Sequence, residues 1–197
     1  MAQPESGAML DNLEQLRRDI DRRLNEAVSN RRSPMHTPVV MAGEADARIM
    51  VLRDFEPATA TARFHTDARA PKVGVIGSGA PVGVLFYDRD DKVQIRCRGT
   101  GWIEQSGPIA DAAWAASTRF ARRCYLGDGP GSPAAGPSSG LPPQFEGCEP
   151  EEHDLIPARA HFAVLLVRLD MIDWFHLAHT GHRRALFENG TGRWITP

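Results

Sequence analysis

The sequence predicts a mainly β protein, built as an antiparallel meander or Greek-key barrel. From residue 37 onward, short runs rich in Val, Ile, Phe and Thr alternate with Gly, Asp and Pro, which is typical of strands joined by turns. Polar turns at 43–46 and 88–91 separate such runs closely enough to form hairpins. The segment before residue 37 has a helical period instead, so we expect helices to flank the β core.

An amphipathic helix is expected over residues 8–29. Apolar residues recur there at steps of three and four, at Leu10, Leu13, Leu16, Ile20 and Leu24. Pro34 and Pro38 end this pattern. We therefore expect an N-terminal helix and linker at 1–35, followed by one barrel domain at 36–197.

Nine strands and two helices are expected in the barrel domain. The strands cover residues 37–42, 47–54, 61–66, 82–88, 92–104, 160–169, 172–178, 182–188 and 192–195. The helices cover residues 71–76 and 108–125. Residues 127–150 are rich in Pro, Gly and Ser, so we expect a long loop that is either a functional lid or disordered.

Composition limits the classes of partner and the compartment. The chain has 23 Lys and Arg residues against 25 Asp and Glu residues, a formal net charge of −2, so no overall basic field favours nucleic acid. The three cysteines, Cys97, Cys124 and Cys148, form no CxxC pair, which argues against a disulfide framework. No apolar run reaches the roughly 18 residues of a membrane span. We expect a soluble, cytoplasmic protein.

Three cations near the start of the barrel favour a phosphorylated ligand. Arg48 and Arg53 bracket an apolar run, and alternation along one strand would direct their side chains to opposite faces. Lys72 follows Pro71 at an expected helix start, where backbone N–H groups and the helix dipole favour an anion. The two arginines are therefore candidates for two different phosphate groups.

Three other motifs suggest a dinucleotide site, a catalytic serine and a metal site, but the surrounding sequence does not favour any of these. Residues 73–83 resemble a Rossmann loop, but the third glycine position holds Val82 and a strand is expected where a helix is needed. Residues 136–140 match G-x-S-x-G, yet a nucleophile elbow needs a preceding strand and a following helix. His176, His179 and His182 have helical spacing in a segment that favours strand and turn, so no metal site is expected.

Six short motifs follow one another in a distinctive order. They are residues 48–53, 64–67, 70–72 and 85–87, then Gln94, and last Trp174 followed by residues 182–184. This order and spacing resemble the flavin-binding split-barrel family of pyridoxamine 5'-phosphate oxidases, particularly its shorter bacterial relatives, over roughly residues 36–197. The resemblance implies a six-stranded antiparallel split β-barrel of Greek-key type. It also implies a homodimer that binds FMN at the subunit interface.

The resemblance also assigns cofactor and substrate contacts. The cofactor contacts it implies are Arg48, Ile49, Met50, Val51, His65, Thr66, Lys72, Gln94 and Trp174. Arg48 and Lys72 form the expected clamp on the FMN phosphate, and Ser138 and Ser139 are expected to reach the flavin of the partner subunit. The substrate contacts it implies are Arg53, His182, Arg183 and Arg184.

Gln94 has a second argument in its favour, because alternation places it opposite Val93 and Ile95. Its amide can both donate and accept hydrogen bonds, as the pyrimidine edge of a flavin requires.

The function implied by the resemblance is an oxidoreductase that oxidises an amine or alcohol substrate by hydride transfer to flavin. Two alternatives stay open. One is a haem-binding or deazaflavin-binding protein of the same fold, and the other is a flavin-binding module without catalytic activity. No catalytic residue is assigned.

Overall fold

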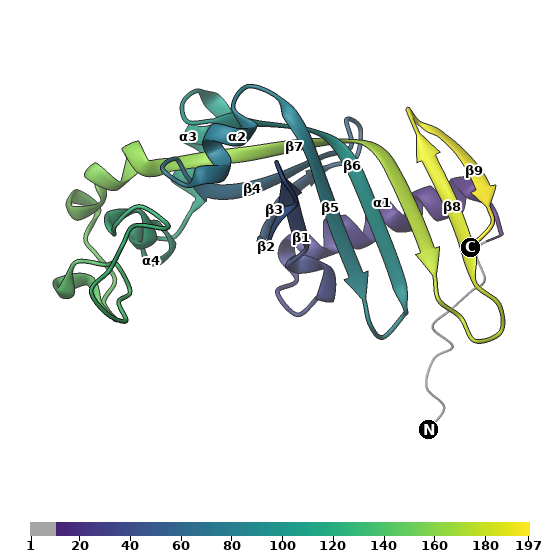
Figure 1. Ribbon diagram of the computed structural model, residues 1–197, viewed down its shortest axis with the longest axis horizontal. Helices are drawn as coiled ribbons and strands as arrows, with labels where there is room; N and C mark the ends of the chain where they lie inside the picture. Colours follow the sequence, from purple (N-terminus) through teal and green to yellow (C-terminus); the bar gives the residue numbers. More distant parts are fainter. Residues whose placement is uncertain (1–10) are drawn as a thin grey trace. The chain divides into compact units, whose positions relative to one another are not determined.

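A computed structural model of the chain describes residues 11–197, which divide into two compact units (Figure 1). The first unit runs to Phe64 and adds Pro81–Thr100 and Val167–Pro197. The second comprises His65–Ala80 and Gly101–Leu166. None of the helices formed by residues 11–197 combines the length and the apolar character needed to cross a membrane. The single barrel domain expected at 36–197 includes parts of both units and stays a prediction.

The described residues form nine strands that belong to one sheet. The strands are β1 (Val39–Ala42), β2 (Asp46–Ile49), β3 (Leu52–Glu56), β4 (Thr61–Asp67), β5 (Ala80–Asp88), β6 (Val93–Glu104), β7 (Phe162–His176), β8 (Arg183–Glu188) and β9 (Thr191–Ile195). Their order is β2-β1-β5-β6-β7-β4-β3, and the β8–β9 hairpin attaches to β7. Antiparallel pairing joins β1 to β2 and β5, β3 to β4, and β8 to β7 and β9. The predicted mainly β class with flanking helices is confirmed.

The strand predicted over residues 47–54 is divided in the structure. β2 pairs with β1, whereas β3 pairs with β4, so the chain changes partners at Met50 and Val51. The backbone N–H of Met50, at this change of partners, donates a hydrogen bond to the carbonyl of Pro38 at 3.0 Å. Arg48 and Arg53 therefore lie on different strands, and side-chain alternation along one strand does not determine their relative directions.

Helix α1 (Leu13–Ser29) lies inside the helix predicted over 8–29, whose first residues, 8–10, fall outside the described part of the chain. It begins where the Asn12 side chain accepts hydrogen bonds from the backbone N–H groups of Glu14 and Gln15. Its buried face packs against β3 and β9 (Figure 1) and consists of Leu16, Ile20, Leu24 and Ala27.

Arg23 ties α1 to the turn between β5 and β6. Its side chain is 16% exposed and forms ion pairs with Asp19 of the same helix and with Asp88 and Asp91 of the turn. Burial alone would lower the pKa of Arg23, but the hydrogen bonds and charges of Asp19 and Asp91 outweigh it and raise that pKa. The guanidinium group therefore stays charged and fixes the helix to the turn.

The second unit contains α2 (Pro71–Ile76), α3 (Pro108–Ala116) and α4 (Arg119–Arg122). The single helix predicted over 108–125 is wrong, because α3 ends at Ala116 and Thr118 caps a new helix by accepting from the N–H of Ala121. The buried side chain of Arg122 donates to the carbonyls of Trp114 and Ala115. It thereby adds a donor to two carbonyls in the last turn of α3, of which that of Trp114 also accepts from the backbone N–H of Ser117.

Short 3₁₀ segments complete the chain and, in the second unit, surround a small core. They are η1 (Pro34–His36), η2 (Arg123–Leu126), η3 (Pro143–Phe145), η4 (Glu152–Leu155) and η5 (Pro157–His161). The core of the second unit consists of Ala110, Ala113, Phe162, Val164 and Leu166, with Trp102, Trp114 and Tyr125 packed against it.

The loop predicted over residues 127–150 is confirmed as a segment whose only helical turn is η3. Arg69 donates to the carbonyl of Gly127 at 2.9 Å, and Arg123 donates to the carbonyls of Phe145 and Cys148. These hydrogen bonds join both ends of the loop to Arg69 and Arg123, which belong to the second unit as the loop does. The role of the loop as a lid stays a prediction.

The two strands predicted at 160–169 and 172–178 are one strand, β7. Gly99 of β6 explains how the backbone of β7 approaches so closely at Arg168. A Cβ atom on Gly99 would lie 1.7 Å from the Arg168 carbonyl oxygen, so only glycine fits there.

Replacing Gly99 by alanine should destabilise the protein, because the added methyl group would overlap the Arg168 carbonyl. We expect the free energy of unfolding to fall by about 1–3 kcal/mol, measured by urea denaturation. The matched control is Gly74→Ala in α2, where no atom lies within 4 Å of the added Cβ. Alanine favours a helix over glycine, so this control should gain stability, by roughly 0.5–1 kcal/mol. Equal stability of the two variants would contradict the close approach of β6 and β7.

Candidate functional site

Arg48 on β2 presents a buried cationic donor. Its paired residue on β1, Val40, is buried together with Val84 on β5, so Arg48 faces the core side of the sheet. One nitrogen, Nη2, forms an ion pair with Asp46. The other, Nη1, is buried and has no hydrogen-bond partner. An unsatisfied buried donor of this kind suits an anionic ligand.

Trp174 on β7 presents a second buried donor. Its side chain is 4% exposed, and the indole Nε1 has no hydrogen-bond partner. A buried indole N–H usually finds an acceptor. Trp174 is thus the second predicted cofactor contact in the first unit whose polar atom lacks a partner within the protein.

The other predicted contacts of this unit are distributed over both faces of the sheet. Gln94 lies opposite the buried Val93 and Ile95, as its alternation predicts. Ile49 is 71% exposed, whereas Met50 is buried and Val51 is half-buried. Arg53, the predicted substrate contact on β3, is exposed beside the buried Leu52.

His65, Thr66 and Lys72 belong to the second unit. His65 packs edge-on against Phe162 with ring centroids 5.0 Å apart, and Thr66 is 5% exposed. Lys72 lies in the first turn of α2, where the sequence predicts it. Because Arg48 belongs to the first unit, its pairing with Lys72 as a phosphate clamp stays a prediction.

The two predicted serines, Ser138 and Ser139, form hydrogen bonds within their own loop. Ser139 Oγ donates to Glu146 at 2.5 Å and accepts from the backbone N–H of Leu141, and Ser138 Oγ accepts from the N–H of Gly140. Both side chains are exposed. Contact with the flavin of a partner subunit stays a prediction for them.

The three histidines near the end of the chain lie in different settings. His176 is the last residue of β7, His179 lies in the following turn, and His182 precedes β8. Burial, followed by the charge of Arg183, lowers the pKa of His176. Residues 11–197 contain no group of three or more His, Cys, Asp or Glu residues that could hold a metal ion.

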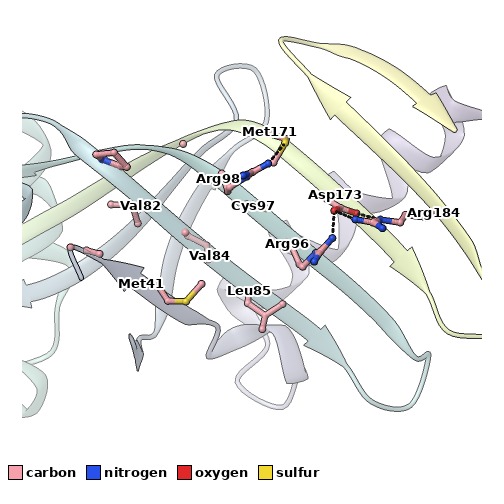
Figure 2. Close-up of a pocket in the computed structure, with 15 residues that line it drawn as sticks. Met41, Val82, Val84, Leu85, Arg96, Cys97, Arg98, Met171, Asp173 and Arg184 are labelled. Carbon is pink, nitrogen blue, oxygen red and sulfur yellow. Dashed lines mark hydrogen bonds and ion pairs between the residues drawn. The ribbon is translucent and has the colours of Figure 1, made fainter. Parts of the chain in front are cut away.

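Arg183 and Arg184, both predicted as substrate contacts, have carboxylate partners. Arg183 pairs with Asp11, and His182 packs against Phe175 with ring centroids 5.6 Å apart. Arg184 donates to Asp173 through Nε at 3.0 Å and through Nη2 at 2.8 Å. Figure 2 shows Arg96 and Arg184 converging on Asp173 from two sides.

Asp173 is a residue that the sequence analysis did not single out. Burial favours the neutral acid, but hydrogen bonds from Arg184 and Arg96 outweigh burial and lower the pKa of Asp173. The carboxylate therefore stays ionised and holds both arginines. Alternation in the sequence could have placed Arg96 beside Gln94, but nothing in the local sequence connects Arg96 with Asp173.

Part of the chain matches a known family in a comparison of sequences. Residues 16–105 match the family described as pyridoxamine 5'-phosphate oxidase, FMN-binding domain. This match confirms the family resemblance. The matched domain is an FMN-binding domain, so FMN as the predicted cofactor is confirmed at the level of the family. No curated protein matches the chain.

Several solved structures have a similar fold. An FMN-binding, pyridoxamine 5'-phosphate oxidase-related protein from Nostoc punctiforme PCC 73102 has 21% identity and a TM-score of 0.71, over 94% of this chain and 100% of that chain. PhzG from Burkholderia lata 383, in complex with tetrahydrophenazine-1-carboxylic acid, has 12% identity and a TM-score of 0.61, over 100% and 98%. A general stress FMN/FAD-binding protein from Xanthomonas citri has 11% identity and a TM-score of 0.52, over 83% and 89%. At these identities the likeness establishes the fold alone.

Two of the predicted cofactor contacts fit FMN chemically, Arg48 within the matched residues 16–105 and Trp174 beyond them. Arg48 Nη1 and Trp174 Nε1 are donors without protein acceptors, and FMN offers phosphate and carbonyl oxygens as acceptors. Gln94 adds an amide that can donate and accept.

Proposed function

We propose that this chain binds FMN and is a flavin-dependent oxidoreductase that oxidises an amine or alcohol substrate. The observation that carries the proposal is the pair of buried donors, Arg48 Nη1 within the residues that match an FMN-binding family and Trp174 Nε1 beyond them. Each donor lacks a protein partner, so an acceptor-rich ligand would relieve an unfavourable feature of the free protein.

Different side chains bind the phosphate and the ring system of FMN. Arg48 and Lys72 hold the phosphate, and Gln94 hydrogen-bonds the pyrimidine edge of the ring system. Bound FMN supplies the hydride-accepting chemistry. The remaining cofactor contacts are Ile49, Met50, Val51, His65, Thr66, Trp174 and, from the partner subunit in the proposed dimer, Ser138 and Ser139.

The substrate is held by cationic and imidazole side chains. Arg53, His182, Arg183 and Arg184 are the residues assigned to this task, and Asp173 keeps Arg184 in place through two hydrogen bonds. Their role is to orient the substrate carbon toward the flavin.

The proposal includes a homodimer with FMN at the subunit interface. Ile49, Val39 and Leu85 are paired across three strands and share a face, and Tyr87 follows Leu85 by two residues on that face. Ile49 is 71% exposed and Tyr87 is 46% exposed, which is typical of an apolar surface that binds a partner. Light scattering should give twice the mass of one chain, and the mass of a single chain would contradict the dimer.

Removing the phosphate clamp should weaken FMN binding. In the double variant Arg48→Ala with Lys72→Ala, two charge-assisted contacts are lost, so we expect the Kd for FMN to rise about a hundredfold or more in a fluorescence titration. The matched control is Arg18→Ala with Lys92→Ala, which removes the same charges. Arg18 pairs with Glu14 on the exposed face of α1. An unchanged Kd in the clamp variant would reject the clamp.

Reduction of the bound FMN by a substrate distinguishes an oxidoreductase from a flavin-binding module without catalytic activity. FMN-loaded protein should lose its flavin absorption under anaerobic conditions when pyridoxamine or pyridoxine 5'-phosphate is added, and regain it with oxygen. If the flavin binds but stays oxidised with both compounds, an oxidase of this substrate class is excluded and the binding proposal stands. A Soret band in the purified protein would instead support haem.

A further inference from the structure

Arg69 belongs neither to the predicted cofactor contacts nor to the predicted substrate contacts, yet its side chain has several partners. It comes directly before Ala70, the residue that precedes the first turn of α2. Its guanidinium group donates to Asp67 through Nε at 3.0 Å and through Nη2 at 2.7 Å. The remaining terminal nitrogen, Nη1, donates to the carbonyl of Gly127 at 2.9 Å. Arg69 therefore connects the start of α2 with the start of the long loop.

Asp67 fixes the direction of the Arg69 side chain. Its carboxylate also accepts from the backbone N–H of Arg69 at 2.8 Å, so three hydrogen bonds join the two residues. Burial alone would raise the pKa of Asp67, but hydrogen bonds from the side chain and the backbone of Arg69 outweigh burial and lower that pKa. The carboxylate is therefore ionised at neutral pH, and its two oxygens hold the guanidinium group in one orientation.

The first residues of the loop pack around Arg69. A Cβ atom added to Gly129 would lie 3.5 Å from Arg69 Cβ and 3.7 Å from Arg69 Cδ, so the loop backbone runs along the aliphatic part of the side chain. Hydrogen bonding to Asp67 raises the pKa of Arg69, and the charge of Asp128 raises it further. The loop therefore interacts with both the apolar and the charged parts of this side chain.

The same residues also close the loop on itself. The backbone N–H of Asp128 donates to the carbonyl of Gly140 at 2.9 Å. Gly127 approaches that carbonyl so closely that a Cβ atom on it would lie 2.8 Å from the oxygen. Ser138 Oγ accepts from the backbone N–H of Gly140 at 2.9 Å, and Ser139 lies between these two residues in the chain. The arginine is thus connected to both serines through the point where the loop closes.

We propose that Arg69 is the positioning residue of the loop segment 127–140, which it holds beside the start of α2 so that Ser138 and Ser139 reach the flavin. This inference rests on the proposed function, in which those serines bind FMN. Arg69 acts through the loop backbone and not through a contact of its own with FMN, because its three guanidinium nitrogens already have partners. A loop that is held in its binding conformation loses less conformational entropy when the ligand binds.

The first measurement is made on the protein without FMN. Arg69→Gln removes the guanidinium group, so amides of residues 127–141 should exchange hydrogen about tenfold faster, as followed by mass spectrometry, while exchange in α3 stays unchanged. The matched control is Arg18→Gln, which removes the same charge from the exposed face of α1 and should exchange as the unsubstituted protein does. Unchanged exchange of residues 127–141 in Arg69→Gln would overturn the inference.

The second measurement is the Kd for FMN in a fluorescence titration. Arg69→Gln should raise this Kd about tenfold. Gly127→Ala should raise it similarly, because the added methyl group would overlap a backbone carbonyl of the same loop while Arg69 stays intact. The control within the loop is Gly136→Ala, where no atom lies within 4 Å of the added Cβ, and its Kd should be unchanged. An unchanged Kd in Arg69→Gln would contradict the positioning role.

A cycle of variants separates positioning of the serines from a merely structural role. In the background Ser138→Ala with Ser139→Ala, Arg69→Gln should raise the Kd for FMN no further, because the arginine acts through the serines. A further tenfold rise in that background would overturn the inference, since Arg69 would then act by another route. If the unsubstituted protein binds no FMN, the proposed function fails, and hydrogen exchange still decides whether Arg69 holds the loop. The two failures are therefore distinguishable.

Discussion

Alternation of side chains along β6 is the constraint on which the rest of the first unit depends. Val93, Ile95 and Cys97 point into the core, so Gln94, Arg96 and Arg98 must point the other way. A slip of one residue would bury two arginines and expose the apolar set, which is strongly unfavourable. Gly99 then brings the backbone of β6 against β7, and within that fixed pairing Asp173 meets Arg96.

Two of the predicted cofactor contacts, Arg48 and Trp174, have buried donors without acceptors. Leaving a buried donor without an acceptor costs about 1–3 kcal/mol, and Arg48 and Trp174 each contain such a donor. A ligand that satisfies these donors recovers part of that free energy and stabilises the folded chain.

The positive charge of the chain is concentrated by tertiary contacts. The composition excludes a global basic field, and Arg96 of β6 and Arg184 of β8, which meet at Asp173, are more than eighty residues apart in sequence. Asp173 holds both arginines through ion pairs, while Arg98 directs Nη2 at the sulfur of Met171.

The sequence by itself determined the β class, the N-terminal helix, the position of Lys72 at a helix start, the face of Gln94 and the family. These features depend on periodicity and on motif order, both of which are local properties of the chain. Only the tertiary structure decided that residues 47–54 change strand partners at Met50, that residues 162–176 form one strand, and that Arg122 completes the end of α3. It also decided which donors are left without acceptors and which arginines Asp173 holds. Those outcomes depend on partners distant in sequence, and a local pattern contains no information about which distant group will meet a given side chain.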